Sequence, residues 1–324
     1  MCQASVTNGT NTNYSRDVQH WYRFCDSFNH DRLNADAYIV REFVAYLFYY
    51  TDKPHGVARS ALTALGNFWT KNGIDWDRKA HPTIAMMLRG YRNLRPSKTR
   101  PKKPFNFHLM AKAMVYCDFN TYNGLLNASA LCIGYYFGGR VGEYTAYTTG
   151  DWSKIVRFCD LKFIGHQPLK SLIVDFRKHK ANQHGLYCAK VEALCSCSNG
   201  ICPVHIIWNY LKFRNTVWAD ATNSPLLLQY KSGAPLNSNH VNNLVKNLVT
   251  KLGLNPYDYS SHSLRSGRAT DLSRCKVKDE HIQKWGRWKS DCWKEHYAKL
   301  DHSDIASITE LTLHDLGIVR NVSF

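Results

Sequence analysis

The chain has 324 residues, of which 44% are hydrophobic, and its formal net charge at pH 7 is +17. At roughly 150 residues per domain this length predicts about two domains, and a positive excess of this size predicts an anionic partner, most often nucleic acid. No apolar run reaches the ~18 residues of a membrane helix, and the polar N-terminal residues indicate no secretory signal. Composition therefore argues against a membrane protein, a secreted precursor and a disordered chain.

The N-terminal third predicts a small all-helical domain. Residues 1–14 are polar and rich in Asn and Thr, and we expect a flexible tail there. Beyond them, apolar side chains recur at spacings of three and four, the period of amphipathic helices. The pattern predicts helices over 15–30, 36–50, 57–71 and 82–94. We expect this domain, residues 15–94, to bind DNA.

A basic linker is predicted over residues 95–104. Residues 92–103 contain six basic residues, two prolines and no acidic residue. Proline lacks a backbone donor and disfavours helix at the residue before it, so the segment is expected to be extended. A solvated linker and a phosphate-contacting linker both fit, and its place between two domains favours contact with phosphates.

A second domain is expected over residues 105–324, mostly α-helical with a small antiparallel β-sheet. Runs rich in Val, Ile and Phe, separated by Gly, Asn and His, predict strands. These runs cover 155–164, 170–176 and 185–191. The predicted helices cover 107–117, 124–137, 204–218, 239–251, 264–275, 279–285 and 291–299.

Chemically informative residues cluster in the C-terminal part. His262 and Arg265 lie three residues apart at the expected start of a helix, which places both on one helix face. A helix N-terminus with these side chains suits a phosphate or an oxyanion. Trp288 precedes Tyr297 by nine residues, and Lys294 and Lys299 flank that tyrosine.

This order of motifs resembles the tyrosine recombinases, the family of phage integrases. His262-Ser263-Leu264-Arg265 is similar to the family's H-x-L-R, and Trp288 and Tyr297 keep its nine-residue spacing. Upstream, Gly138-Gly139-Arg140 leads into R-x-x-E with Glu143. The residues of the Gly286-Arg287-Trp288 turn resemble those of recombinases of eukaryotic mobile elements, the DIRS and Crypton groups, and of some viral integrases, more than those of bacterial ones. The resemblance covers about residues 15–300.

The family also has a lysine on a β-hairpin, for which the segment DFRKHKANQHG offers Lys178 and Lys180. In related sequences this lysine begins a K-[TN]-x-x-x-G turn, which ends in glycine five residues later. Lys180 lies five residues before Gly185 and fits that frame, although Ala181 replaces the expected Thr or Asn. We therefore prefer Lys180.

The resemblance implies cleavage and rejoining of DNA through a 3′-phosphotyrosyl intermediate, with no cofactor and no catalytic metal. Arg140 and Arg265 would grip the non-bridging phosphate oxygens with their planar guanidinium groups. His262 would assist by hydrogen bonding or proton transfer, and Trp288 can donate through its indole N–H. By resemblance, Tyr297 is the nucleophile and Lys180 protonates the leaving 5′ oxygen.

Simpler interpretations of the same residues stay open. Arg140 is also placed to form a helix-end salt bridge with Glu143, and Lys180 to be an ordinary solvated hairpin residue. Trp288 and Tyr297 could simply pack in the core.

Eleven cysteines without a secretion signal indicate reduced, intracellular thiols. One group, Cys195, Cys197, Cys202 and His205, has the pattern C-x-C-x4-C-x2-H, and zinc could take these four ligands tetrahedrally. The spacing is not a common zinc spacing, and Cys202-Pro203 also resembles a helix start. A structural zinc and a metal-free helix start both remain as interpretations.

The sequence thus predicts an integrase of a mobile element or virus, acting on double-stranded DNA, intracellular, and nuclear if the host is eukaryotic. The alternatives are an inactive DNA-binding protein of the same fold, a type IB topoisomerase and a zinc-dependent nucleic-acid module. By resemblance, we expect a tetramer on DNA. The apolar residues of 301–324 can dock in the same domain or in a neighbouring protomer.

Overall fold

The structure is a computed structural model, and it forms two compact units, Met1–Arg100 and Pro101–Phe324. It describes residues 8–96, 101–147, 152–165, 168–179, 182, 185–197, 201–217, 227–291 and 293–294. Lys180, Tyr297 and the segment 301–324 lie outside the described residues, as do linker residues 97–100. No helix in the described part of the chain is long and apolar enough to cross a membrane.

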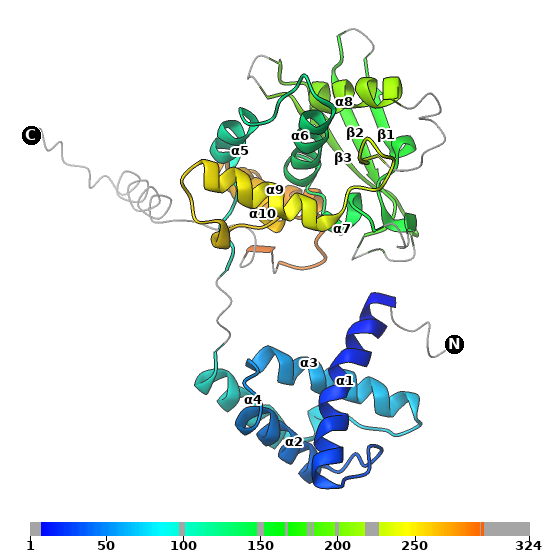
Figure 1. The fold of residues 1–324 in the computed structure, drawn as a ribbon, viewed down its shortest axis with the longest axis vertical. Coiled ribbons are helices and arrows are strands. Elements are labelled where there is room, and N and C mark those ends of the chain that lie inside the picture. Colours follow the sequence, from blue (N-terminus) through cyan, green and yellow to red (C-terminus); the bar gives the residue numbers. More distant parts are fainter. Residues whose placement is uncertain are drawn as a thin grey trace, which may run out of the picture. The chain divides into compact units, whose positions relative to one another are not determined.

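The first unit is all-helical within its described residues (Figure 1). Its helices are α1 (Asn8–Phe28), α2 (Ala37–Tyr49), α3 (His55–Lys71) and α4 (Pro82–Leu94), with a short 3-10 helix at Arg78–Ala80. Trp21 and Trp69 are fully buried and cross edge to face with 5.4 Å between ring centroids. Both indole N–H groups donate to the carbonyl oxygen of Arg32, at 2.9 and 3.1 Å. The loop between α1 and α2 is therefore fixed to the core of the unit.

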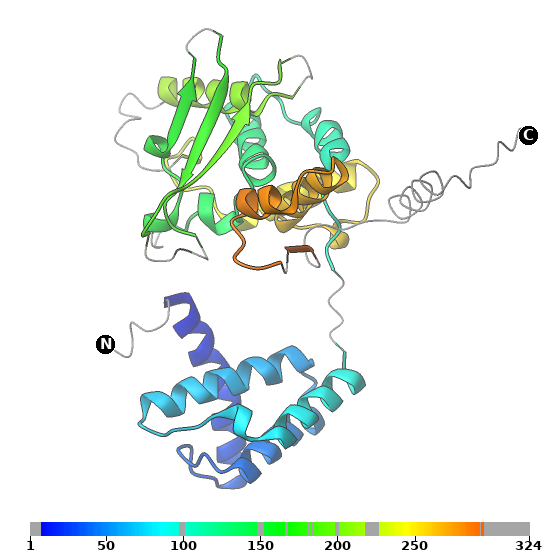
Figure 2. The ribbon, with the colours of Figure 1, turned by 180° about the vertical axis from the view of Figure 1, so that it is seen from behind.

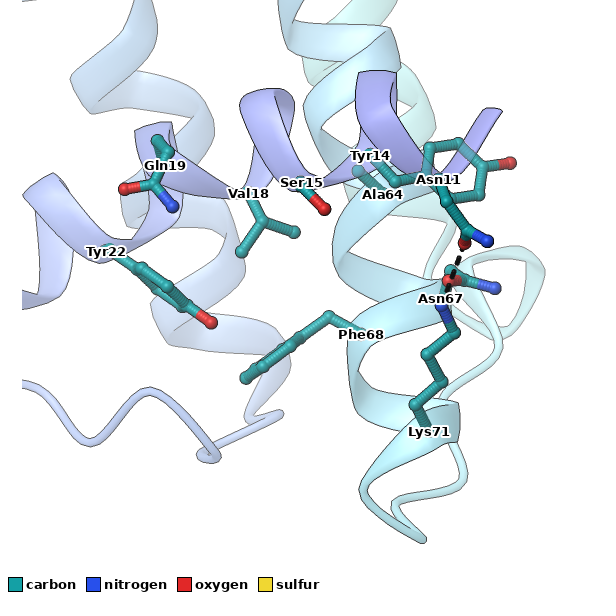
Figure 3. Close-up of a pocket in the computed structure, with 10 residues that line it drawn as sticks. All are labelled: Asn11, Tyr14, Ser15, Val18, Gln19, Tyr22, Ala64, Asn67, Phe68 and Lys71. Atoms are coloured by element: carbon teal, nitrogen blue, oxygen red, sulfur yellow. Dashed lines mark hydrogen bonds between the residues drawn. The ribbon is translucent and has the colours of Figure 1, made fainter. Parts of the chain in front are cut away.

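Helix α1 begins at Asn8, within the stretch 1–14 for which the sequence predicts a flexible tail. The composition misleads there because Asn and Thr are weak helix formers, whereas packing against α3 supplies the stability. Asn11 accepts a hydrogen bond from Lys71 Nζ at 3.0 Å, and Tyr14 and Phe68 line the same shallow pocket between α1 and α3 (Figure 3).

The second unit combines helices with one small sheet, which confirms the predicted fold class. Its helices are α5 (Phe107–Met114), α6 (Tyr122–Tyr135), α7 (Val141–Tyr144), α8 (Pro203–Val217), α9 (Ser238–Lys251), α10 (His262–Arg274) and α11 (Asp279–Gly286). Its strands are β1 (Leu161–Ile164), β2 (Ser171–Phe176) and β3 (Ala189–Leu194). Most of the helix predicted over 291–299 lies outside the described residues.

The sheet is antiparallel in the order β1-β2-β3, with Leu161 opposite Val174 and Phe176 opposite Ala189. Helix α8 covers one face of it (Figure 2). Phe163 of β1 packs edge to face on Trp208 of α8. Strand β1 is shorter than the predicted run 155–164, and β3 is shifted along the chain from the predicted run 185–191 to Ala189–Leu194. Residues 158–160 form a 3-10 turn before β1, and β3 begins at Ala189, after the loop in which Gly185 has a φ of +71°.

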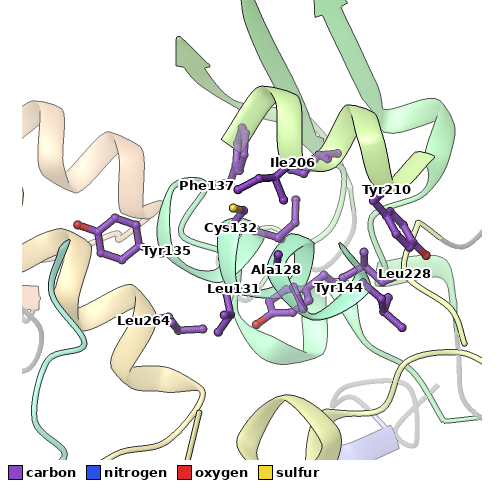
Figure 4. Close-up of a cluster of buried hydrophobic side chains, with 14 of the residues drawn as sticks. Ala128, Leu131, Cys132, Tyr135, Phe137, Tyr144, Ile206, Tyr210, Leu228 and Leu264 are labelled. Carbon is purple, nitrogen blue, oxygen red and sulfur yellow. The ribbon is translucent and has the colours of Figure 1, made fainter. Parts of the chain in front are cut away.

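Helix α6 is the centre of the second unit and is buried on almost every side. It packs between α8 and α10, where Leu131, Tyr135 and Leu264 belong to one hydrophobic cluster (Figure 4). A Cβ atom at Gly134 would lie 2.7 Å from Leu264, so glycine allows α10 to approach closely. This contact places the C-terminal end of α6 beside the first turns of α10.

The end of the predicted linker docks on α10. The backbone N–H groups of Lys103 and Phe105 donate to the carbonyls of Asp258 and Ser263, at 2.7 and 2.8 Å. Lys103 also forms an ion pair of 2.9 Å with Asp258. A Cβ atom at Gly267 would overlap the carbonyl oxygen of Phe105. Residues 103–105 are thus held against the second unit.

We predict that Gly267→Ala lowers the free energy of unfolding of the full chain by about 2 to 4 kcal/mol, because the backbone at Phe105 must move away. Gly142→Ala is the matched control, since nothing lies within 4 Å of a Cβ atom there. It should stay within about 1 kcal/mol of the wild type. Chemical denaturation measures both, and equal stabilities would show that 103–105 do not press on α10.

Candidate active site

The turn from α6 to α7 carries Arg140, immediately before the first residue of α7. Its guanidinium Nη1 donates to Glu143 Oε1 at 2.9 Å, and its backbone N–H donates to Glu143 Oε2 at 2.9 Å. The helix-end salt bridge considered from the sequence is therefore present. The side chain of Arg140 is still 21% exposed. Pairing with Glu143 orients the guanidinium without covering it.

Helix α10 supplies His262 and Arg265. His262 is the first residue of the helix and is exposed, at the end where the helix dipole is positive. Arg265, one turn later, is only 1% exposed. Its guanidinium donates to the backbone carbonyls of Gly138 and Gly286. Arg265 therefore links the turn before Arg140 to the end of α11.

Trp288 lies just after α11 and covers Arg265. The guanidinium carbon of Arg265 is 4.4 Å from the centroid of the Trp288 ring, which also stacks on Trp293 at 5.7 Å. A Cβ atom at Gly286 would overlap the ring of Trp288, so this position requires glycine. Trp288 thus belongs to an aromatic cluster and at the same time contacts one of the candidate site residues.

Arg287 is a site residue that the sequence analysis did not select. It is 6% exposed and has a left-handed backbone conformation, with φ 55° and ψ 41°. Its guanidinium donates to Glu143 Oε2 at 2.6 Å and to Gly138 O at 2.9 Å, and it lies 3.7 Å from the centroid of the Phe176 ring. The signal available in the sequence was its position in the turn Gly286-Arg287-Trp288.

Glu143 is the carboxylate shared by these arginines. Burial opposes its ionisation, but the guanidinium groups of Arg287 and Arg140 outweigh burial and hold the pKa of Glu143 below its ordinary value. Burial lowers the pKa of Arg287, and Glu143 acts against that shift. Arg140 and Arg287 pair with this ionised carboxylate and Arg265 acts on it through its charge alone, so the three arginines leave an excess of two positive charges.

His179 lies close to Glu143 and these arginines, and the sequence analysis did not select it either. Its side chain is buried, and neither ring nitrogen has a hydrogen-bond partner among the described residues. Burial, and then the charge of Arg287, lower its pKa, so the imidazole is neutral at pH 7. The signal was its adjacency to Lys180 in the hairpin segment.

Of the two lysines considered, Lys178 is described. Its Nζ donates to Ser153 Oγ at 3.3 Å, and its side chain lies against the position of Gly185. Lys180 lies outside the described residues, so the choice of Lys180 over Lys178 stays a prediction. Tyr297 stays a prediction for the same reason, because it also lies outside the described residues.

Comparison with known proteins finds one matching family and several solved structures of similar fold. Residues 203–304 match the model of the phage integrase family. Among solved structures, the XerH site-specific recombinase, in its post-cleavage complex with the difH substrate, superposes with a TM-score of 0.62 at 13% identity, covering 92% of this chain and 78% of that one. The Tn1549 transposon integrase in complex with transposon right end DNA gives a TM-score of 0.56 at 13% identity, covering 96% and 95%. Lambda integrase residues 75–356, a dimer bound to a core site, give 0.55 at 14%, covering 91% and 90%.

The chain has the fold of a tyrosine recombinase, and residues 203–304 match the phage integrase domain. No curated protein sequence matches at a significant level. The integrase match begins with the first residue of α8 and includes His262, Arg265, Trp288 and Tyr297. Arg140, Glu143 and the hairpin lie before it and are brought to it by folding.

We predict that Glu143→Gln lowers the free energy of unfolding of this recombinase-like chain by about 3 kcal/mol or more, because it leaves the buried guanidinium of Arg287 without its counter-charge. The control is Glu280→Gln, at a side chain that is 71% exposed, which should stay within about 0.5 kcal/mol of the wild type. Equal effects of the two substitutions in denaturant titration would contradict a structural role for the Arg287–Glu143 pair.

Proposed function

We propose that the protein is a site-specific DNA recombinase or integrase that cleaves and rejoins DNA strands through a covalent 3′-phosphotyrosyl intermediate. One observation carries the proposal. Arg140 and Arg265, which are 125 residues apart in the sequence, meet around Gly138 and Glu143 in a chain that has the recombinase fold. The net charge of +17 supports DNA as the substrate.

In the proposed reaction the Tyr297 hydroxyl oxygen attacks the scissile phosphorus. The Tyr297 O–P bond forms, the bond from phosphorus to the 5′ oxygen breaks, and the 3′ phosphate stays on the protein. His262 assists removal of the tyrosine proton, and Lys180 delivers a proton to the leaving 5′ oxygen. Attack of a 5′ hydroxyl on the phosphotyrosine reverses every step, so rejoining needs no external energy source.

The arginines stabilise the charge that develops on the non-bridging oxygens. Arg140 is partly exposed and oriented by Glu143, which suits direct contact with a phosphate. Arg265 is buried and held by two carbonyls, so its charge is fixed before substrate binds. His262 is exposed one turn earlier on the same helix, which suits direct contact with a phosphate. Trp288 would donate its indole N–H to the phosphate.

Strand exchange between two duplexes requires several protomers, and we infer that they assemble as a tetramer on DNA. The helical first unit and the second unit would both contact the duplex. If the host is eukaryotic, this substrate places the protein in the nucleus.

We predict that Tyr297→Phe abolishes covalent attachment to DNA and leaves DNA binding nearly unchanged, because only the attacking oxygen is lost. A nicked suicide substrate, from which the cleaved product diffuses away, traps the adduct for detection by gel. Tyr257→Phe is the control, at a tyrosine near His262 that is 77% exposed, and it should form adducts like the wild type. Adducts formed by Tyr297→Phe would exclude Tyr297 as the nucleophile.

We predict that Arg140→Ala slows single-turnover cleavage by a factor of roughly 10² or more, as loss of a preorganised donor does. Arg140→Lys should recover little of this rate, because an ammonium group cannot grip two oxygens in one plane. Comparing the two variants separates loss of charge from loss of the planar fork. A cleavage rate near the wild-type value in Arg140→Ala would remove Arg140 from the reaction.

A further inference from the structure

The structure brings four metal-ligating side chains together between the sheet and α8. Cys195 follows β3 directly, Cys197 lies two residues further on, Cys202 immediately precedes α8, and His205 is in the first turn of that helix. The four candidate ligand atoms all lie within 4.8 Å of one another. We propose that Cys195, Cys197, Cys202 and His205 bind one structural zinc ion.

The separations among Cys195, Cys202 and His205 fit a tetrahedron around one ion, and the two that involve Cys197 are shorter than tetrahedral values by about 0.5 Å. With Zn–S near 2.3 Å and Zn–N near 2.05 Å, tetrahedral ligands are about 3.8 Å apart for two sulfurs and about 3.5 Å apart for sulfur and nitrogen. Cys195 Sγ lies 3.7 Å from Cys202 Sγ and 3.6 Å from His205 Nδ1. Cys202 Sγ lies 3.4 Å from the same nitrogen, and Cys197 Sγ lies 3.0 Å from it. All three sulfurs thus surround Nδ1 at one edge of the imidazole.

The sulfurs do not form a disulfide. Cys195 Sγ and Cys197 Sγ are 3.2 Å apart, whereas a disulfide bond is about 2.05 Å long. Three thiolates and one imidazole are a donor set that zinc prefers. The backbone N–H of Ser196 points at Cys202 Sγ at 3.4 Å, as expected for a donor that stabilises a metal-bound thiolate.

The surroundings indicate a structural ion. The N–H of Cys195 donates to the carbonyl of Lys170, and the carbonyl of Cys202 accepts from Ile206, so both sides of the cluster are fixed by the backbone. The cluster lies at the base of the β2–β3 hairpin, where Ser171 pairs with Leu194. Ala189, at the opposite end of β3, is six residues from Cys195, about 20 Å at 3.3 Å per residue. Its partner Phe176 contacts Arg287 there, so the cluster lies far from the candidate active site. Four protein ligands also fill the coordination of zinc, which leaves no position for a substrate.

The test uses the full chain, purified in reductant without chelator or added metal. Metal analysis by mass spectrometry should find about one zinc ion per wild-type chain. Cys197→Ser should lose most of this zinc, and because Cys197 is exposed the substitution leaves the hydrophobic core unchanged. The control is Cys188→Ser, at an exposed free cysteine outside the cluster, and it should keep the wild-type zinc content.

Two further measurements identify the ligands. Cobalt(II) bound to the zinc-depleted protein should show the thiolate-to-metal absorption of a tetrahedral site. In Cys197→Ser the absorption per bound cobalt ion should be lower by about one third, because two thiolates remain of three. A chelator should lower the midpoint of thermal unfolding of the wild type and of Cys188→Ser, and should leave that of Cys197→Ser unchanged. Wild-type protein that holds no zinc and gives no cobalt spectrum, or whose mass shows a Cys195–Cys197 disulfide, would overturn the proposal. None of these readouts depends on DNA cleavage.

Discussion

The candidate site depends on the buried ion pair between Arg287 and Glu143, which joins the turn after α11 to α7 across 144 residues of sequence. Removing both charges from water costs several kcal/mol per ion, and the attraction offsets this cost only when the other polar atoms are also satisfied. Here they are. Arg287 donates to the carbonyls of Phe137 and Gly138, and Glu143 accepts from the backbone and side chain of Arg140. One contact therefore sets the positions of Arg140 and of Trp288, the residue after Arg287.

The residues around this ion pair carry a net positive charge. One carboxylate faces three arginines, and those arginines keep it ionised by lowering its pKa. In the proposed reaction, a phosphodiester carries one negative charge and gains more on its oxygens as the nucleophile attacks. A fixed excess of two positive charges, held by backbone carbonyls and aromatic rings, meets that change without reorganising. An apolar replacement for Glu143 would leave the arginines to repel one another, and a second carboxylate would halve the excess.

The sequence predicted the helices and the sheet well because their signals are local. Apolar spacing of three and four marks α2, α3 and α4, and Val/Ile-rich runs mark β1 and β2. It was less informative where tertiary contacts decide. Helix α1 extends back to Asn8 because it packs on α3, and the role of Arg287 depends on Glu143, which no local pattern connects to it. His179 was overlooked because neither its burial nor its three arginine neighbours can be seen in the sequence.

The sheet links the two sites from opposite ends. At one end, the ring of Phe176 lies under the Arg287 guanidinium, and the hairpin that follows carries His179. Asn182 closes this hairpin, since its side chain donates to the carbonyl of Arg177 and accepts from the N–H of Leu186. At the other end, the cysteine cluster joins β3 to α8, the helix that packs on α6. A short sheet with four to six residues per strand is marginal by itself. A metal at its base would therefore hold the strands that present the hairpin, and so would act on the position of His179 without approaching the arginines.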